Sequence, residues 1–205
     1  MFQTIEIEDH VRVEPELFGF NVEEAVKKQL EKSYENFIDE DMGSVIAVLD
    51  VMHVGEGILI PGDAAGYYEA SFRLLTFKPR LQELVYGQIT QIANFGAFMN
   101  IGSFEAMIHI SQTMDDFVSF SKTDTLIGRN TKRVLKKGDL CMARIVALSY
   151  RTLPPKIGLT MRQPGLGKIE WIADEKRRAK LEETKMARAA EKAGKPEKKK
   201  EAKKK

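Results

Sequence analysis

The sequence has little cysteine: Cys141 is the only one among its 205 residues. A single thiol cannot form an internal disulfide, and it cannot supply a zinc site built from several cysteines. Its apolar neighbours, Leu140 and Met142, are typical of a small side chain packed in a core. We therefore expect Cys141 to have a structural role.

Long apolar runs are also missing. No run approaches the roughly 20 residues that a membrane-spanning helix needs. The first residues include Glu6, Glu8 and Asp9, so the basic start and apolar stretch of a signal peptide are absent. A cytoplasmic location is the resulting expectation. The hydrophobic content of 43% is enough to fill the cores of two small domains.

Catalytic motifs are absent as well. The glycines of Gly55-Glu56-Gly57 are too few and wrongly placed for a dinucleotide or phosphate-binding loop. Asp115 and Asp116 are adjacent, but no histidine or cysteine cluster accompanies them, so we interpret them as solvated carboxylates. The sequence predicts no catalytic centre, no metal and no cofactor.

Basic and acidic residues are unevenly distributed along the chain, although the net charge is only +2. Residues 1–80 hold 7 basic and 16 acidic residues, a net charge of −9. Residues 81–167 hold 10 basic and 6 acidic residues, a net charge of +4, and residues 168–205 hold 15 basic and 8 acidic residues, a net charge of +7. Phosphate contacts dominate nucleic-acid affinity, so the later parts suit a polyanion and the first part does not.

The first 80 residues show the pattern of an α+β domain. Residues 5–13 alternate apolar and polar as in a strand, and Pro15 ends that stretch. A helix follows, for which Asn21 and Glu24 have capping-box spacing. Further strands are predicted at residues 45–52, 58–60 and 67–77, the first of them central and covering the helix. The apolar face of the helix is predicted to consist of Val22, Val26, Leu30, Tyr34 and Phe37.

This β-α-β-β order would suit an RNA-recognition module, but the Lys/Arg-Gly-aromatic-Gly-aromatic motif of such modules is absent. Together with the acidic charge, that absence favours a protein-binding domain. The turn-rich segment from Gly55 to Gly66 could be a hairpin with aliphatic side chains in the core, or a tip that projects toward another protein. Both interpretations stay open. The tip residues would be Gly55, Glu56, Gly57, Ile58, Leu59, Ile60, Pro61, Gly62 and Asp63.

From Leu84 the pattern changes to five short strands, which is typical of an OB-type barrel. They are predicted at residues 84–93, 95–101, 105–111, 140–148 and 156–161. The long connection at residues 112–138 is expected to carry an extra helix and a short strand.

The barrel has the side chains that single-stranded RNA requires. Phe95 and Phe98 can stack on bases, and His109 can add a stack or a hydrogen bond. For either phenylalanine alone a core position is as good an explanation, and His109 could instead pack against the two rings. Basic residues that could follow the sugar-phosphate backbone are Lys122, Arg129, Lys132, Arg133, Lys136, Lys137 and Arg144.

Three segments of the barrel form a recognisable pattern: Gly87 to Phe98, Glu105 to Ser111 and Lys137 to Ile145. Together they resemble the RNA-binding OB domain named after the largest protein of the bacterial small ribosomal subunit. The similarity keeps the glycines, aromatics and histidine in order over about 80 residues. It implies an RNA contact through Phe95, Phe98 and His109.

Five further segments complete the pattern of the chain: Met1-Phe2, Asp9 to Val13, Phe18-Gly19, Gly55 to Asp63 and Thr76 to Pro79. Together with the barrel motifs, they make the whole chain to about Gln163 resemble the stalk subunit of archaeal DNA-directed RNA polymerase and its eukaryotic counterparts, including the seventh subunit of RNA polymerase II. The resemblance implies a truncated RNP-like first domain that docks on the polymerase core, an obligate heterodimer with a small helical stalk subunit, and binding of emerging single-stranded RNA. It also implies that catalysis belongs to the largest subunit.

We therefore divide the chain into a docking domain at residues 1–80, an OB domain at residues 81–163 and a basic tail at residues 164–205. The tail has helix formers from Ile172 to Ala190 and a lysine-rich end that is expected to be disordered. It could contact nucleic acid nonspecifically or serve only solubility. The barrel alone would also fit a free-standing RNA-binding protein of translation or RNA decay.

Overall fold

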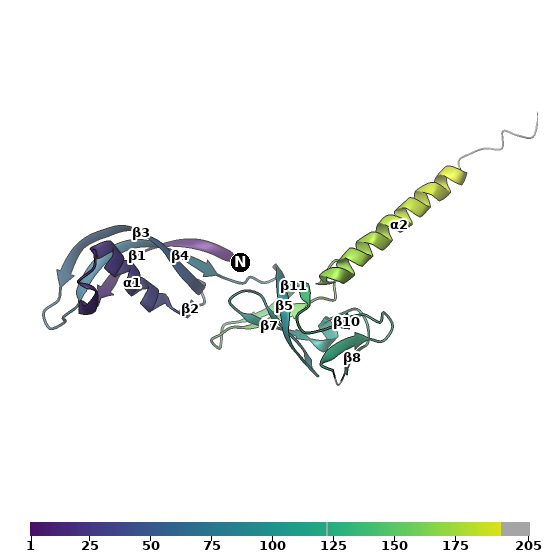
Figure 1. The fold of residues 1–205 in the computed structure, drawn as a ribbon, viewed down its shortest axis with the longest axis horizontal. Coiled ribbons are helices and arrows are strands. Elements are labelled where there is room, and N and C mark those ends of the chain that lie inside the picture. The colour runs from purple at the N-terminus through teal and green to yellow at the C-terminus, as the bar shows by residue number, and fades with distance from the viewer. Residues whose placement is uncertain (122, 194–205) are drawn as a thin grey trace, which may run out of the picture.

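The computed structural model describes residues 1–121 and 123–193. A curved sheet with one helix forms the first domain, a barrel forms the second, and a long helix extends from the barrel (Figure 1). Predicted site residue Lys122 and the lysine-rich end at residues 194–205 lie outside the described residues. No helix in the described part is long and apolar enough to cross a membrane.

The first domain is an antiparallel sheet with strand order β1-β4-β3-β2, covered on one face by α1. Its core consists mainly of aliphatic side chains around Phe72 and Leu74, both fully buried. The elements are β1 (Phe2–Val13), a 3-10 turn η1 (Pro15–Leu17), α1 (Val22–Tyr34), β2 (Ile38–Asp39), β3 (Gly43–Leu59) and β4 (Gly66–Phe77).

The helix differs in two details from its prediction. Asn21 is the N-cap, but its side chain makes no capping hydrogen bond; its backbone carbonyl instead accepts from Ala25 at 2.8 Å. The buried face is Ala25, Val26, Gln29 and Leu30. Val22 is 42% exposed because it occupies the first turn, and Phe37 is 40% exposed because the helix ends at Tyr34. The predicted face was therefore too wide at both ends.

Strand β3 is one strand of 17 residues, where two separate strands were predicted. Its register against β4 shifts after Val45, Val48, Val51 and Val54. Each shift inserts an extra residue, so the side chains repeat about every three residues instead of every two. Those four valines pack into the first core. The residues after the first three (Ile46, Leu49 and Met52) are exposed, so the apolar run does not mark a strand buried on both faces.

The second domain is a closed barrel, as the sequence predicts. Strand β12 pairs antiparallel with β11 and parallel with β7, which closes the sheet. Its core includes the fully buried residues Ile89, Met99, Ile108, Ile145 and Leu159. The strands are β5 (Leu84–Ala93), β6 (Gly96–Asn100), β7 (Glu105–His109), β11 (Leu140–Ser149), β12 (Lys156–Thr160) and the short β13 (Gly167–Lys168) beside β11.

The connection between β7 and β11 forms a small sheet of its own. Its strands are β8 (Val118–Ser121), β9 (Thr125–Gly128) and β10 (Val134–Leu135), in the order β10-β9-β8. The expected extra helix is not found among the described residues of this connection beyond Gln112, where the 3-10 turn η2 (Ile110–Gln112) ends. Three strands replace the expected helix and single strand, so that expectation was wrong.

Phe77 joins the two domains. It is the last residue of β4, yet its ring is fully buried in the core of the barrel. The ring lies 5.9 Å from Phe104 of the barrel and 5.0 Å from Phe2 of β1, measured between centroids. The terminal ammonium of Met1 adds an ion pair with Glu83, at 3.3 Å. The end of β4 is therefore anchored in the core of the barrel.

The long helix α2 (Ile169–Ala193) starts three residues before the predicted helical segment. Its first turns are attached to the barrel. The Arg133 guanidinium lies 5.5 Å from the centroid of the Trp171 ring and pairs with Glu175 at 2.6 Å. Lys168, just before the helix, pairs with Asp139 at 3.0 Å. These contacts fix where α2 leaves the barrel.

Candidate nucleic-acid interface

The two predicted stacking residues and the histidine lie on the outer face of neighbouring strands. Along β6 the side chains alternate, so Ala97 and Met99 point into the core while Phe98 points outward. His109 ends β7 and also points outward, since Ile108 before it is fully buried. The register places Gly96 opposite His109. The face therefore presents Phe98 and His109 together.

Phe95 stands in the turn before β6, next to the end of β7. Its ring is 48% exposed and lies edge-to-face with Phe98, with centroids 5.9 Å apart. Its carbonyl accepts a hydrogen bond from Ile110 at 2.9 Å, which holds the turn beside His109. The close approach needs glycine at position 96, because a Cβ there would lie 2.1 Å from the Ile108 carbonyl oxygen.

His109 is oriented by Ser111. Its Nδ1 accepts from the Ser111 backbone N–H at 3.3 Å and lies 2.8 Å from the Ser111 hydroxyl. Because Nδ1 is an acceptor here, the neutral imidazole carries its proton on Nε2. That nitrogen is left as a donor on the exposed side of the ring.

Met107 was missed by sequence reasoning. It lies directly opposite Phe98 in the register and is 37% exposed. The alternation of Glu105 to His109 was the available signal, because it places every second side chain outside. A flexible thioether beside two rings extends the apolar platform.

The predicted basic residues fall into two groups. Arg129, Lys132, Lys136 and Lys137 are exposed. Arg133 is engaged with Trp171 and Glu175, as described above. On β11, Arg144 is half-buried, and its Nε is buried without a hydrogen-bond partner among the described residues. The exposed group is the one available to a phosphate backbone.

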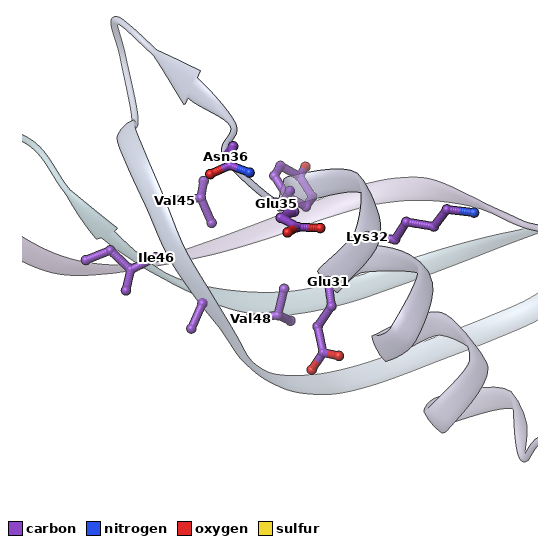
Figure 2. A pocket seen from close by; sticks show the side chains of 9 residues that line it. Glu31, Lys32, Glu35, Asn36, Val45, Ile46 and Val48 are labelled. Atoms are coloured by element: carbon purple, nitrogen blue, oxygen red, sulfur yellow. The ribbon is translucent and has the colours of Figure 1, made fainter. Parts of the chain in front are cut away.

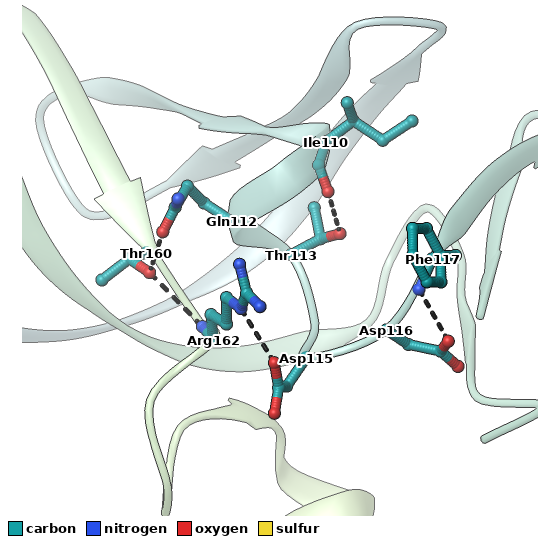
Figure 3. Close-up of polar contacts among 8 residues, drawn as sticks. All are labelled: Ile110, Gln112, Thr113, Asp115, Asp116, Phe117, Thr160 and Arg162. Atoms are coloured by element: carbon teal, nitrogen blue, oxygen red, sulfur yellow. Dashed lines mark hydrogen bonds and ion pairs between the residues drawn. The ribbon is translucent and has the colours of Figure 1, made fainter. Parts of the chain in front are cut away.

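Asp115 and Asp116 have partners in the fold, whereas the sequence suggested carboxylates that are only solvated (Figure 3). The Asp116 side chain accepts from the backbone N–H groups of Phe117, Asn130 and Thr131 and from the Thr131 hydroxyl, at 2.6 to 2.9 Å. The hydrogen bonds from Thr131 lower the pKa of Asp116, with further contributions from Phe117 and Asn130. Asp115 pairs with Arg162 at 2.9 Å. Both carboxylates therefore hold the loop.

No cluster of three or more histidine, cysteine or acidic residues that could hold a metal ion occurs within residues 1–121 and 123–193. Cys141 is fully buried, and burial raises the pKa of its thiol to about 12. A thiol with that pKa is protonated at neutral pH and is a weak nucleophile.

The proposed tip is the far end of the β3–β4 hairpin. Its three aliphatic residues are exposed: Ile58 by 60%, Leu59 by 70% and Ile60 by 46%. The interpretation that places these side chains in the core is therefore wrong, and binding of another protein at the tip stays a prediction. Gly55 to Leu59 belong to β3, so the turn itself is shorter than the glycines suggest.

Asp63 holds this turn in shape. Its carboxylate accepts from the Arg12 guanidinium at 2.9 and 3.0 Å, from the Tyr67 hydroxyl at 2.8 Å and from the Ala65 N–H at 3.1 Å. The Arg12 hydrogen bonds, followed by those of Tyr67 and Ala65, hold the pKa of Asp63 well below its usual range. The tip is thereby fastened to the end of β1.

This arrangement predicts a pH dependence of the tip. A carboxyl group with a lowered folded pKa stabilises the fold fully above its ordinary pKa of about 3.9, and that contribution is lost as the pH falls through the lower folded value. We expect NMR titration to show Asp63 still ionised at about pH 4, and Asp63→Asn to speed amide exchange at residues 60 to 67. Glu56→Gln is a control on the same hairpin. Titration of Asp63 at an ordinary aspartate value would contradict the assignment.

A separate groove of about 490 Å³ lies between the C-terminal half of α1 and β3. Figure 2 shows Glu31 and Glu35 on the helix side, with Val45 and Val48 on the strand side. Ile46 points away from the helix. None of the predicted site residues lines this groove.

Comparison with known proteins gives a match for each of the two folded parts. Residues 8–64 match the family described as "SHS2 domain found in N terminus of Rpb7p/Rpc25p/MJ0397", and residues 78–152 match the S1 RNA binding domain. The chain is 38% identical over 180 residues to DNA-directed RNA polymerase subunit Rpo7 of Saccharolobus solfataricus, which covers 86% of this chain and 100% of that protein.

Two further likenesses are more partial. The chain is 34% identical over 114 residues to DNA-directed RNA polymerase III subunit RPC8 of Saccharomyces cerevisiae, covering 56% of this chain and 54% of that one. The solved a/eIF2alpha-aDim2p-rRNA complex from Pyrococcus horikoshii contains a chain with 26% identity and a TM-score of 0.35, covering 57% of this chain and 59% of that chain.

Proposed function

Because the chain belongs to the Rpo7 family of DNA-directed RNA polymerase subunits, we propose that it forms the stalk of the polymerase and binds emerging single-stranded RNA. It is a subunit of the polymerase complex, without a catalytic centre of its own, and it carries an S1 RNA-binding domain. In the proposal the first domain docks, the barrel binds RNA, and the domain boundaries fall after residues 80 and 163. A cytoplasmic location follows from that assignment.

The single observation that carries the RNA part is the outward face of β6 and β7. Phe95, Phe98 and His109 gather there with Met107. Rings held in place on a barrel face stack with bases of any sequence, so we expect weak base preference. Arg129 and Lys132 are exposed and can contact neighbouring phosphates of the same RNA strand.

The docking part rests on the tip. An aliphatic cluster at the end of a long hairpin, fastened by Asp63, is a preorganised apolar surface. Ile58, Leu59 and Ile60 would be buried against polymerase core subunits. The acidic first domain is unsuited to nucleic acid, which supports a protein partner for this end.

We also propose a heterodimer with a small helical stalk subunit. The exposed stripe of Ile46, Leu49 and Met52 supports this, because it is apolar surface in excess of what the first domain covers itself. The alternative of a free-standing RNA-binding protein explains only the barrel. The match to Rpo7 includes the first domain as well, and therefore disfavours that alternative.

Co-purification tests the docking proposal. We expect tagged wild-type chain to recover polymerase core subunits, and Ile58→Asp/Leu59→Asp to lose them, because burying each aliphatic side chain contributes about 1.5–3 kcal/mol. That corresponds to a loss of at least about a hundredfold in affinity for the pair. Leu181→Asp, at a position 60% exposed on α2, is the matched control. Unchanged recovery of the core by the tip variant would exclude the tip as the docking site.

A further inference from the structure

A second concave site lies beside the barrel face. A cavity of about 450 Å³ is lined by η2, the start of β8 and Arg162 after β12. Its volume falls within the range of small-molecule sites, about 300–1,000 Å³. Figure 3 shows Phe117 and Arg162 on either side of the segment that carries Asp115. None of the residues predicted to bind RNA lines it.

Phe117 is an exposed ring on a fixed backbone. The side chain is 76% exposed, more than any other large apolar side chain among those described. Its carbonyl accepts from the Arg129 N–H at 2.9 Å, and its own N–H donates to Asp116 at 2.6 Å. The same Asp116 carboxylate holds Asn130 across the loop at 2.9 Å. The ring is thus presented to solvent without freedom of its main chain.

Arg162 forms the opposite wall. Its Nε donates to Asp115 Oδ1 at 2.9 Å, and its backbone N–H donates to the Thr160 hydroxyl at 3.3 Å. The guanidinium is planar, and the ion pair uses only one of its five N–H donors. The remaining edge can contact a phosphate, and its face can stack on a base.

The cavity is continuous with the RNA-binding face proposed above. Ser111 lines the cavity, and its hydroxyl lies 2.8 Å from Nδ1 of His109. Ile110 also lines it, and its N–H donates to the carbonyl of Phe95. An RNA strand that crosses the face formed by Phe95, Phe98 and His109 and continues over η2 therefore reaches this cavity next.

We infer that the cavity is a second nucleobase site, which takes one base of the same RNA strand after it has crossed the barrel face. The base stacks on Phe117, and Arg162 contacts its phosphate or its open face. The inference rests on the proposed RNA-binding function. It fits a base better than an apolar peptide, because the lining combines one ring with a guanidinium, two carboxylates and Asn130.

The test uses the full chain co-expressed with its small stalk partner and two single-stranded RNAs, one of 4 and one of about 12 nucleotides. Phe117→Ala is expected to weaken binding of the long RNA about tenfold and to leave the short one unchanged, because one stacked base is lost. A 2-aminopurine scan of the long RNA should show one position whose quenching disappears in this variant. Phe117→Tyr should retain both signals.

Tyr86→Ala is the matched control, since Tyr86 is an exposed ring on β5 that does not line the cavity. An unchanged Tm will show that Phe117→Ala is folded. Wild-type affinity of Phe117→Ala for the long RNA, with no position dequenched, overturns the second site. If the Phe95→Ala/Phe98→Ala/His109→Ala variant still loses affinity for RNA, the proposed RNA-binding function holds even though the second site does not. If wild-type chain binds neither RNA, both fail.

Discussion

Replacing Phe95, Phe98 and His109 together by alanine is expected to lower the affinity for single-stranded RNA by at least about thirtyfold. Each base stacked on an aromatic ring contributes about 1–3 kcal/mol, and two rings are lost. The variant removes no lysine or arginine, so the slope of log affinity against log salt should stay as in the wild type. Fluorescence anisotropy at several salt concentrations measures both quantities.

Partner binding and Tm must be compared in the same preparations, because Phe98 is half-buried. Arg129→Ala/Lys132→Ala is the informative counterpart. It should weaken binding and flatten the salt dependence, since phosphate contacts release counterions. Wild-type affinity of a folded triple variant would make the three side chains structural and move the RNA contact to the basic loop or the tail.

Phe77→Ala is expected to lower the free energy of unfolding by about 3–5 kcal/mol. Large-to-small changes of a fully buried phenylalanine remove its packing and leave a cavity. Here the cavity opens between the domains, so the unfolding transition should also separate into two. Denaturant unfolding followed by the single tryptophan, Trp171 near the barrel, and by far-ultraviolet circular dichroism reports both effects.

Phe2→Ala is the control for Phe77, because Phe2 stacks on the same ring but is 59% exposed. We expect it to cost clearly less stability and to keep one transition. A loss below about 1 kcal/mol for Phe77→Ala, with coincident transitions by both probes, would show that the ring does not couple the domains.

Sequence patterns were most informative where one rule dominates the local structure. The five barrel strands follow the period of two except at one register shift each in β5 and β11, and their predicted bounds agree with the structure within two residues. Strand β3 does not follow this period, because bulges after Val45, Val48 and Val51 change it to about three residues. Nothing in a single sequence separates a bulged strand from a strand buried on both faces.

The site shows the same limit. Exposure of Phe95 and Phe98 could not be decided from residue type, since a phenylalanine on a strand is as often in the core. The sequence does not show how Asp115 and Asp116 are held, because their partners Arg162 and Thr131 lie 47 and 15 residues away. In the sequence Phe117 is only part of a long connection. Its role depends on a loop closed by those distant partners.

The burial of Phe77 in the barrel has a mechanical consequence. A linker of free residues would let the RNA face move widely around the docking point, whereas the last residue of β4 is packed in the barrel core and restricts that movement. If the tip is seated on the polymerase, the barrel face then stands at one set distance from it. In that arrangement a transcript would reach Phe95 only after it has grown to a fixed length.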